Sequence, residues 1–306
     1  MTGPGSEGGA TVMMDMWEKV ARGRGFFAAL DQSGGSTPAA LRRYGVPDDA
    51  WGDEATMFDL VHAMRTRIVT SPAFGGDRVI AAILFEQTMD RTVDGTGFAE
   101  YLWQHKGVVP FVKIDQGLAD EEDGVRLMRP MPGLDALLDR AQTHGVLGTK
   151  MRSLVRRADP VGIEAVVEQQ FRAARTVLEA GMLPIVEPEV DILSPDKAAA
   201  EHLLQHALLR HLDALDAGRA VVLKLTLPEL DDGHVPLLEH PRVLRVAALS
   251  GGYARIEAVA RLERQHGVVA SFSRALTEGL RADMTDEEFD TALDASIGAV
   301  YAASLT

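Results

Sequence analysis

One lysine lies in the middle of an apolar run that has the composition of a buried strand. The run Ala220–Pro228, AVVLKLTLP, contains no other charged residue. Moving an ammonium group out of water without a partner is costly, and proteins commonly relieve that cost by favouring the neutral, nucleophilic amine. Lys224 is therefore a candidate for Schiff-base chemistry with a carbonyl substrate. The alternative is that the strand ends near Lys224 and the amine reaches solvent.

Charged or hydroxyl side chains also stand at the ends of seven further apolar runs. In chain order they are Asp31 and Ser33, Glu86, Lys113 and Asp115, Lys150 and Arg152, Glu187 and Glu189, Ser250, and Arg274. Several of them are spaced two residues apart, so their side chains can share one face of a strand. Unpaired charges on inward-facing positions would destabilise the fold. We therefore interpret the set as a functional site rather than as solvated strand ends.

Two glycine-rich turns could bind anions. Ser250-Gly251-Gly252 follows an apolar run and precedes a helical segment, so backbone N–H groups and a helix N-terminus can hold a phosphate there. Arg274 could add a bidentate contact. The stretch Asp31–Thr37 (DQSGGST) is a weaker second candidate, because such turns often bind nothing. Two phosphate sites would indicate a bisphosphorylated ligand.

The elements that must position these residues alternate along the chain. The eight predicted strands are Phe26–Leu30, Val79–Phe85, Val108–Ile114, Val146–Met151, Met182–Val186, Val221–Leu225, Val243–Leu249 and Val268–Phe272. The helical segments between them include Asp53–Ile68, Leu134–His144, Pro160–Ala180, Ser194–Ala217 and Ala254–Gln265. This alternation predicts a single (β/α)8 TIM barrel, an α/β fold in which the C-terminal ends of all strands meet at one face and form the active site. No dinucleotide-binding fingerprint follows the first strand, which disfavours a doubly wound alternative.

Composition excludes several classes of function. The net charge of −14 argues against a general nucleic-acid or anionic-membrane surface, so an anionic ligand needs a local positive site. The absence of cysteine removes disulfides, thiolate nucleophiles and cysteine-based metal sites. With no long apolar run and no visible secretory signal, we expect a cytoplasmic protein. We further expect residues 1–14 to be a flexible segment and residues 15–306 to be one barrel domain.

From about residue 15 onward, these motifs together resemble class I fructose-1,6-bisphosphate aldolase, in its shorter, bacterial-type form. The residues that carry the resemblance are Leu30–Ser33 (LDQS), Ile83–Glu86 (ILFE), Val112–Gly117 (VKIDQG), Thr149–Arg152 (TKMR), Pro184–Glu189 (PIVEPE), Leu223-Lys224, Leu249–Gly252 (LSGG) and Ser271–Leu276 (SFSRAL). The resemblance implies a lyase of glycolysis and gluconeogenesis that reversibly cleaves fructose 1,6-bisphosphate to dihydroxyacetone phosphate and glyceraldehyde 3-phosphate. It implies a lysine Schiff base and neither metal nor cofactor.

The resemblance also implies a role for each matched residue. Lys224 corresponds to the imine-forming lysine, Glu187 to the proton-transfer carboxylate and Asp31 to the group that assists cleavage of the C3–C4 bond. Lys150 corresponds to the lysine beside the imine, with Arg152 and Glu189 supporting the charge network. The C1 phosphate ligands correspond to Ser250, Gly251, Gly252 and Arg274, and those near the C6 phosphate to Ser33, Ser36 and Lys113.

The physical chemistry of these residues agrees with those roles. A cation such as Lys150 would disfavour protonation of the neighbouring Lys224 by like-charge repulsion. Crowding Glu187 against Glu189 would make one of the two carboxyl groups a better proton donor. The C-terminal end, Gly298–Thr306, lacks the long mobile tail whose terminal tyrosine transfers a proton in the animal enzymes. Tyr301 falls in a predicted final helix, so we do not assign it that role.

Other functions remain open at this point. The substrate could be a related ketose phosphate, such as tagatose 1,6-bisphosphate or fructose 1-phosphate. A non-catalytic phosphosugar-binding protein would keep the phosphate ligands but would not need Lys224, Glu187 and Asp31 together. A metal-dependent enzyme would need histidine ligands, and the pair His202 and His206 fits a solvated helix face better. We expect a phosphorylated sugar as substrate and a homo-oligomeric assembly.

Overall fold

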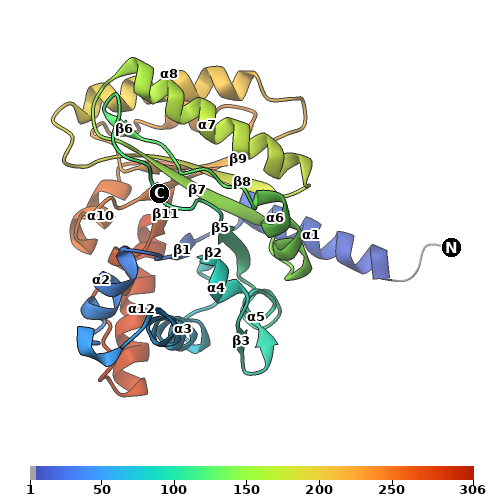
Figure 1. The fold of residues 1–306 in the computed structure, drawn as a ribbon, viewed down its shortest axis with the longest axis vertical. Helices are drawn as coiled ribbons and strands as arrows, with labels where there is room; N and C mark the ends of the chain where they lie inside the picture. Colours follow the sequence, from blue (N-terminus) through green and yellow to red (C-terminus); the bar gives the residue numbers. More distant parts are fainter. Residues whose placement is uncertain (1–4) are drawn as a thin grey trace.

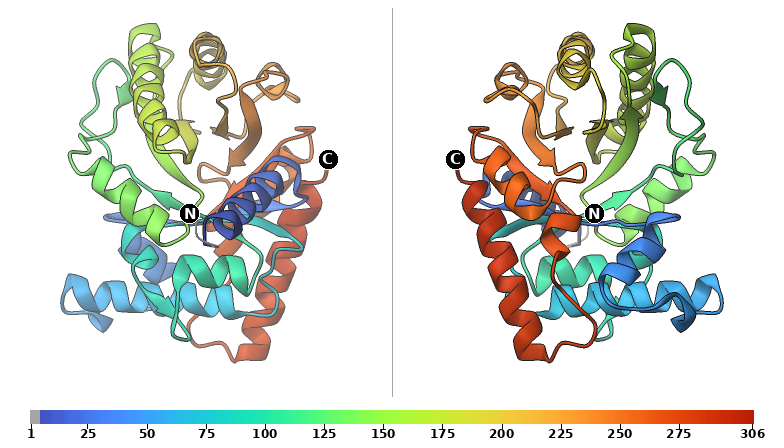
Figure 2. Two further views of the ribbon diagram at one scale, coloured as in Figure 1. Left: turned by 90° about the vertical axis from the view of Figure 1, so that its right-hand side faces the viewer. Right: turned by 90° about the vertical axis from the view of Figure 1, so that its left-hand side faces the viewer.

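Eight parallel strands close into a barrel in the computed structural model, which describes residues 5–306 (Figures 1 and 2). They are β1 (Phe26–Leu30), β2 (Val79–Leu84), β5 (Val109–Lys113), β7 (Gly148–Val155), β8 (Leu183–Val190), β9 (Val221–Thr226), β10 (Val243–Leu249) and β11 (Val269–Phe272). The order β5-β2-β1-β11-β10-β9-β8-β7 is closed by pairing of β5 with β7. The predicted (β/α)8 fold is confirmed.

Helices cover the outside of the barrel (Figure 2). The longer ones are α2 (Ser36–Arg43), α3 (Glu54–Thr70), α5 (Phe98–Gln104), α6 (Leu134–Thr143), α7 (Pro160–Glu179), α8 (Lys197–Asp213), α10 (Arg255–Leu262) and α12 (Asp286–Ala303). All five predicted helical segments are present, with small differences at their ends. Their starts follow local chemistry: Asp159 accepts from two backbone N–H groups of α7, Pro160 occupies its first turn, and Thr285 forms a capping box with Glu288 on α12.

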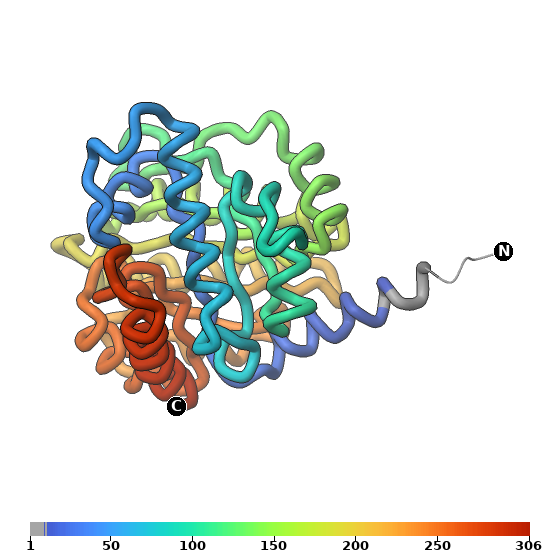
Figure 3. Tube along the Cα trace, turned by 90° about the horizontal axis from the view of Figure 1, so that it is seen from below, coloured from blue at the N-terminus to red at the C-terminus, as the bar shows by residue number. Residues whose placement is uncertain are grey.

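Helix α1 (Gly5–Arg22) closes the amino-terminal end of the barrel. Met16 and Val20 are buried against inward-facing residues of the strands, including Phe27, Ile80 and Phe111. Figure 3 shows α1 running past the edge of the barrel. The helix begins inside the segment that we expect to be flexible, and no change of element marks residue 14. Residues 1–4 lie outside the described residues. With one end sealed, the carboxyl end of the barrel is the open face.

Two strands run further than their apolar residues indicate. Strand β7 continues to Val155 and β8 to Val190, and the two pair in register from Gly148 and Leu183 onward. Arg152, Glu187 and Glu189 therefore lie within strands, not after them as the apolar runs predict. The charged side chains interrupt the apolar pattern, but backbone pairing carries the strands past them because these side chains face a polar pocket inside the barrel.

Short elements complete the chain. These are the 3-10 helix Asp48–Ala50, the helices α4 (Glu86–Met89), α9 (Val235–Leu238) and α11 (Arg274–Thr277), the hairpin of β3 (Thr92–Val93) and β4 (Thr96–Gly97), and β6 (Val125–Arg126), which pairs antiparallel with β7. Within residues 5–306, none of the helices has the length and hydropathy needed to cross a bilayer.

Candidate active site

A cavity of about 730 Å³ opens at the carboxyl end of the barrel and gathers the predicted site residues. Its lining includes Asp31, Ser33, Ser36, Lys113, Lys150, Arg152, Glu187, Glu189, Lys224, Ser250, Gly251 and Arg274. Gly252 does not line the cavity but lies beside it, because a Cβ at this position would come within 3.0 Å of an Arg274 guanidinium nitrogen. Barrel closure therefore brings together residues from seven different strands and the loops that follow them.

Two lysines share one carboxylate at the bottom of this cavity. Glu187 Oε1 lies 2.9 Å from Lys224 Nζ, and Glu187 Oε2 lies 2.8 Å from Lys150 Nζ. Lys150 also pairs with Asp31 Oδ2 at 2.6 Å. Lys224 is only 4% exposed and lies within β9, so the alternative in which its amine reaches bulk solvent is wrong. The carboxylates replace the water that the two ammonium groups lose on burial.

The electrostatics of this cluster fix the charge of Lys150 and Asp31. Burial alone would raise the pKa of Asp31, but the Lys150 and Lys224 ammonium groups outweigh it and hold that pKa well below its usual range. Burial alone would lower the pKa of Lys150, but Asp31 and Glu187 outweigh it and hold that pKa above its usual range. Lys150 is thus a permanent cation beside Lys224.

Each remaining carboxylate of the cavity has its own cation. Glu189 pairs with Arg152, and Asp115 Oδ1 lies 2.7 Å from Lys113 Nζ. Burial lowers the pKa of Arg152, and Glu189 more than offsets that effect. The expected crowding of Glu187 against Glu189 is therefore not the arrangement found. The reason is that β7 supplies a cation to each of them, Lys150 to Glu187 and Arg152 to Glu189.

The turn after β10 requires glycine at two positions. Gly251 and Gly252 have φ values of 59° and 130°, which side chains rarely adopt. A Cβ on Gly251 would also lie 2.5 Å from Ile192 Cγ2. Helix α10 begins shortly after the turn. Arg274, the first residue of α11, lies beside Gly252 of the turn. Glycine is therefore required here by both backbone conformation and space.

The turn after β1 is held by its own serines. Ser36 Oγ donates to the carbonyl of Ser33 at 2.9 Å and accepts from the Ser33 N–H at 3.0 Å. Both serines line the cavity, and α2 begins at Ser36. Glu86, which follows β2, lies apart from the site, since it pairs with Arg140 of α6 and does not line the cavity.

Sequence reasoning missed several residues of the cavity wall. These are Gln32, Arg43, Arg126, Ser271 and Ser273. Ser271 is 2% exposed, and its Oγ has no hydrogen-bond partner among the described residues, so a ligand could satisfy it. Ser271 lies on β11 three residues before Arg274, and both side chains line the cavity. This closeness to a predicted phosphate ligand could have identified Ser271. Arg43 ends a helix and Arg126 lies in a short antiparallel strand, so a search restricted to the ends of parallel strands overlooks both.

The cavity is positive although the chain is acidic. Seven cationic side chains line it, namely Arg43, Lys113, Arg126, Lys150, Arg152, Lys224 and Arg274, against the four carboxylates Asp31, Asp115, Glu187 and Glu189. The whole chain carries a net charge of −14. Burial lowers the pKa of Arg43, and the neighbouring cations Arg274 and Arg42 lower it further. Such a concentration of positive charge favours an anionic ligand.

Comparison with known proteins agrees with this geometry. The family model described as "Fructose-bisphosphate aldolase class-I" matches residues 17–216. The chain belongs to this family. It is 57% identical over 289 residues to a fructose-bisphosphate aldolase class 1 of Synechocystis sp., covering 94% of this chain and 96% of that protein. It is 50% identical over 288 residues to the class 1 enzyme of Porphyromonas gingivalis, covering 94% and 98% respectively. The resemblance inferred from the sequence is confirmed.

A solved aldolase structure has the same fold as this chain. Fructose-bisphosphate aldolase from Plasmodium falciparum, solved in complex with TRAP and a small-molecule inhibitor, superposes with a TM-score of 0.74. The alignment covers 98% of this chain and 95% of that chain at 19% sequence identity. At that identity the similarity concerns the fold alone.

The histidine pair weighed as a metal site lies on the outer helix α8. His202 and His206 are both exposed, and their ring centroids are 4.4 Å apart in an edge-on arrangement. Among residues 5–306, no group of three or more histidine or acidic side chains has a geometry that could hold a metal ion. Neither histidine lines the active-site cavity.

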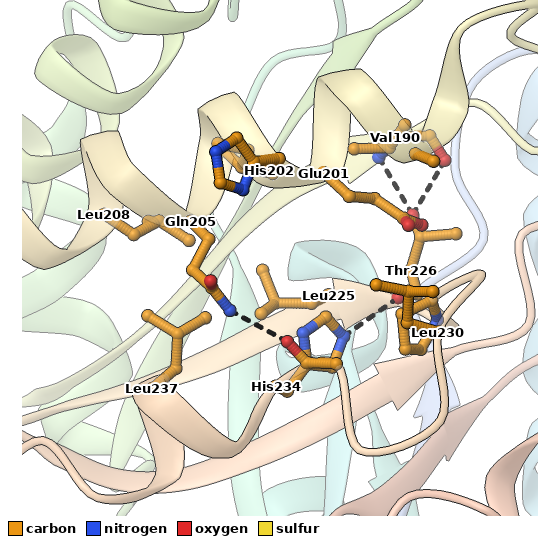
Figure 4. Close-up of a pocket in the computed structure, with 14 residues that line it drawn as sticks. Val190, Glu201, His202, Gln205, Leu208, Leu225, Thr226, Leu230, His234 and Leu237 are labelled. Carbon is orange, nitrogen blue, oxygen red and sulfur yellow. Dashed lines mark hydrogen bonds between the residues drawn. The ribbon is translucent and has the colours of Figure 1, made fainter.

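A second, smaller cavity of about 90 Å³ lies between α8 and the end of β9 (Figure 4). His234 Nε2 donates to the carbonyl of Thr226 at 3.1 Å. Thr226 Oγ1 in turn donates to the carbonyl of Val190 at 2.8 Å and accepts from its N–H at 2.9 Å. Gln205 Nε2 donates to the carbonyl of Gly233 at 2.8 Å. These contacts tie the end of the Lys224 strand to β8 and α8.

His234 should make the stability of the protein sensitive to acid. Burial lowers its pKa from 6.5 to about 4. The unfolded chain therefore binds more protons between these values, so the contribution of His234 is fully present above pH 6.5 and declines as the pH falls towards 4. For His234→Gln, we expect the wild-type advantage in unfolding free energy to shrink by up to about 3 kcal/mol between pH 7 and pH 4. Urea unfolding at both pH values measures it, with exposed His202→Gln as control. An advantage that does not change with pH would contradict the prediction.

Proposed function

We propose that this chain reversibly cleaves fructose 1,6-bisphosphate to dihydroxyacetone phosphate and glyceraldehyde 3-phosphate through a Schiff base on Lys224. The observation that carries the proposal is the buried cluster in which Glu187 bridges Lys224 and Lys150 at 2.9 and 2.8 Å. Its position in a positive cavity between two anion-binding turns supports a bisphosphorylated substrate. Family membership supports the same reaction.

Substrate binding would use the two turns as phosphate sites. The Ser250-Gly251-Gly252 turn and Arg274 would hold the C1 phosphate through backbone N–H groups and the guanidinium. Ser33, Ser36 and Lys113 would hold the C6 phosphate. Arg43, Arg126 and Ser271 add further donors to the same cavity. Because Lys113 already pairs with Asp115, the arginines supply most of the uncompensated charge.

Imine formation begins when the Lys224 amine attacks the C2 carbonyl of the ketose. The amine must first lose a proton, and Glu187 is the adjacent acceptor. Lys150 stays charged, because Asp31 and Glu187 hold its pKa above its usual range. Glu187 can then return the proton to the C2 hydroxyl of the carbinolamine, which leaves as water and produces the protonated imine.

Cleavage follows because the protonated imine accepts electrons. The C4 hydroxyl loses its proton, the C3–C4 bond breaks, glyceraldehyde 3-phosphate departs, and the electron pair forms an enamine with the imine nitrogen. Asp31 remains ionised and is placed to accept that proton, with Lys150 holding its carboxylate in position. Protonation of the enamine at C3 and hydrolysis then release dihydroxyacetone phosphate. Tyr301 lies on α12 and does not line the cavity, so we assign it no role in this step.

The test is covalent trapping in the presence of EDTA. The protein is incubated with dihydroxyacetone phosphate and sodium borohydride, and its intact mass and peptides are measured. The sequence contains six lysines, so the adduct can be assigned without ambiguity. We expect one reduced adduct per chain, on Lys224. Phosphosugar binding without an adduct would indicate a binding protein or a metal-dependent enzyme instead.

Substrate preference, assembly and location are further proposals. Cleavage assays with fructose 1,6-bisphosphate and tagatose 1,6-bisphosphate compare the two C4 epimers, and we expect preference for the former. We expect the protein to be cytoplasmic and to form a homo-oligomer. Size-exclusion chromatography with light scattering would measure the oligomeric state.

A further inference from the structure

A buried lysine outside the active site, Lys197, contacts the segment that follows β9. Lys197, the first residue of α8, is 6% exposed and does not line the active-site cavity. Its Nζ donates to the carbonyl of Leu227 at 2.9 Å and pairs with Glu201 at 2.5 Å and with Glu229 at 3.0 Å. Leu227 lies just after β9, the strand that carries Lys224. An ammonium group with three acceptors fixes the position of this segment.

Glu229 extends the contacts from β9 to the turn after β10. The Glu229 carboxylate, which already pairs with Lys197, also lies 3.6 Å from a guanidinium nitrogen of Arg261. The Arg261 guanidinium lies over the Tyr253 ring, 4.2 Å from its centroid. Arg261 therefore links the Glu229 carboxylate to the Tyr253 ring.

Tyr253 is the residue that ends the Ser250-Gly251-Gly252 turn. Its backbone N–H donates to the carbonyl of Ser250 at 2.9 Å. The N–H of Leu227 also donates to the carbonyl of Leu249, at 3.2 Å, which joins the ends of β9 and β10 directly. A continuous set of contacts thus runs from Lys197 through Glu229 and Arg261 to Tyr253 and the turn.

We propose that Tyr253 and Glu229 are positioning residues that fix the Ser250-Gly251-Gly252 turn relative to the Lys224 strand. This inference rests on the proposed function, in which the turn binds the C1 phosphate while Lys224 forms the imine at C2. Neither residue touches the substrate site in this arrangement. They set the distance between the phosphate site and the amine, so their loss should affect only substrates that carry the phosphate.

The test compares phosphorylated and unphosphorylated substrates on one variant. Tyr253→Leu keeps an apolar side chain at this position but removes the ring that Arg261 covers. We expect the dihydroxyacetone phosphate concentration that gives half-maximal borohydride trapping to rise about two- to fivefold, the effect of losing one cation–π contact. Trapping of dihydroxyacetone, which has no phosphate, should keep the wild-type rate. Glu229→Gln should shift the same quantity in the same direction.

Tyr101→Leu is the matched control, because Tyr101 lies on α5 and its ring stacks on His105 instead of on a residue of this set. It should behave as wild type with both substrates. Equal losses for the phosphorylated and unphosphorylated substrates in Tyr253→Leu, or no change with either, would overturn the inference alone. Failure of the wild type to form an adduct would overturn the proposed function and this inference with it.

Discussion

Replacing Lys224 with methionine should lower kcat for fructose 1,6-bisphosphate cleavage by at least about 10⁴-fold, because the variant cannot form a covalent intermediate. Methionine fills a similar volume within β9 and removes an ammonium group that is only 4% exposed. The fold should therefore survive, with Glu187 still paired to Lys150. Phosphate ligands are untouched, so the variant should still bind substrate. Steady-state kinetics measure kcat. Competition between inorganic phosphate and fructose 1,6-bisphosphate for the variant measures substrate binding.

Lys19→Met is the matched control for this prediction. Lys19 lies on α1 at the closed end of the barrel, and its Nζ donates to the carbonyl of Gly76 at 2.7 Å. Its replacement should leave kcat within about twofold of wild type, as expected for a residue away from the site. Residual Lys224→Met activity close to the wild-type rate, with borohydride still inactivating the protein, would place the imine on another lysine.

Replacing Glu187 with glutamine should lower kcat by about 10²- to 10⁴-fold, the usual effect of removing a general acid or base. The carboxylate contacts both lysines, so no neighbour can take over both proton transfers. Asp31 is already paired with Lys150, and its pKa is held too low for it to donate a proton. Imine formation from dihydroxyacetone phosphate, followed by rapid-quench borohydride trapping, should slow in parallel with kcat.

The same substitution should also destabilise the fold. Glu187→Gln leaves two buried ammonium groups with Asp31 as their remaining anionic partner, and breaking a buried ion pair commonly costs about 3 kcal/mol or more. Urea unfolding measures this loss. The control is Glu164→Gln, because the partly exposed Glu164 of α7 pairs with Arg210 and His211 of α8 and should lose less than about 1 kcal/mol. An unchanged trapping rate in Glu187→Gln would assign the proton transfer to another group.

The order of strands along the chain could be predicted because each is a short apolar run that the fold buries on both faces. Val79–Leu84 and Val221–Thr226 are buried at every position, which local composition alone indicates. Since barrel closure gathers all the carboxyl ends, the polar residues at those ends predict a site before any contact is known. Glu187 and Asp31 became candidates in this way, and Lys224 as the one charged residue of its apolar run.

Strand length was less predictable. The apolar run after Gly181 stops at Val186, yet β8 continues to Val190 through Glu187, Pro188 and Glu189. The hydrogen bonds that extend it come from β7, which is distant in the sequence. Local composition carries no information about a partner strand. A strand predicted from its apolar run is therefore too short wherever the strand carries charged residues into a site.

The sequence by itself determined the barrel, its open face and the residue types that meet there, since these follow from the burial pattern and spacing within each strand. Only the tertiary structure decided which charges pair. Glu187 contacts two lysines and Glu189 contacts Arg152, although the two glutamates are nearly adjacent in the chain. Ion pairs depend on the register and closure of strands far apart in sequence, and the same closure places Arg43, Arg126 and Ser271 on the cavity wall.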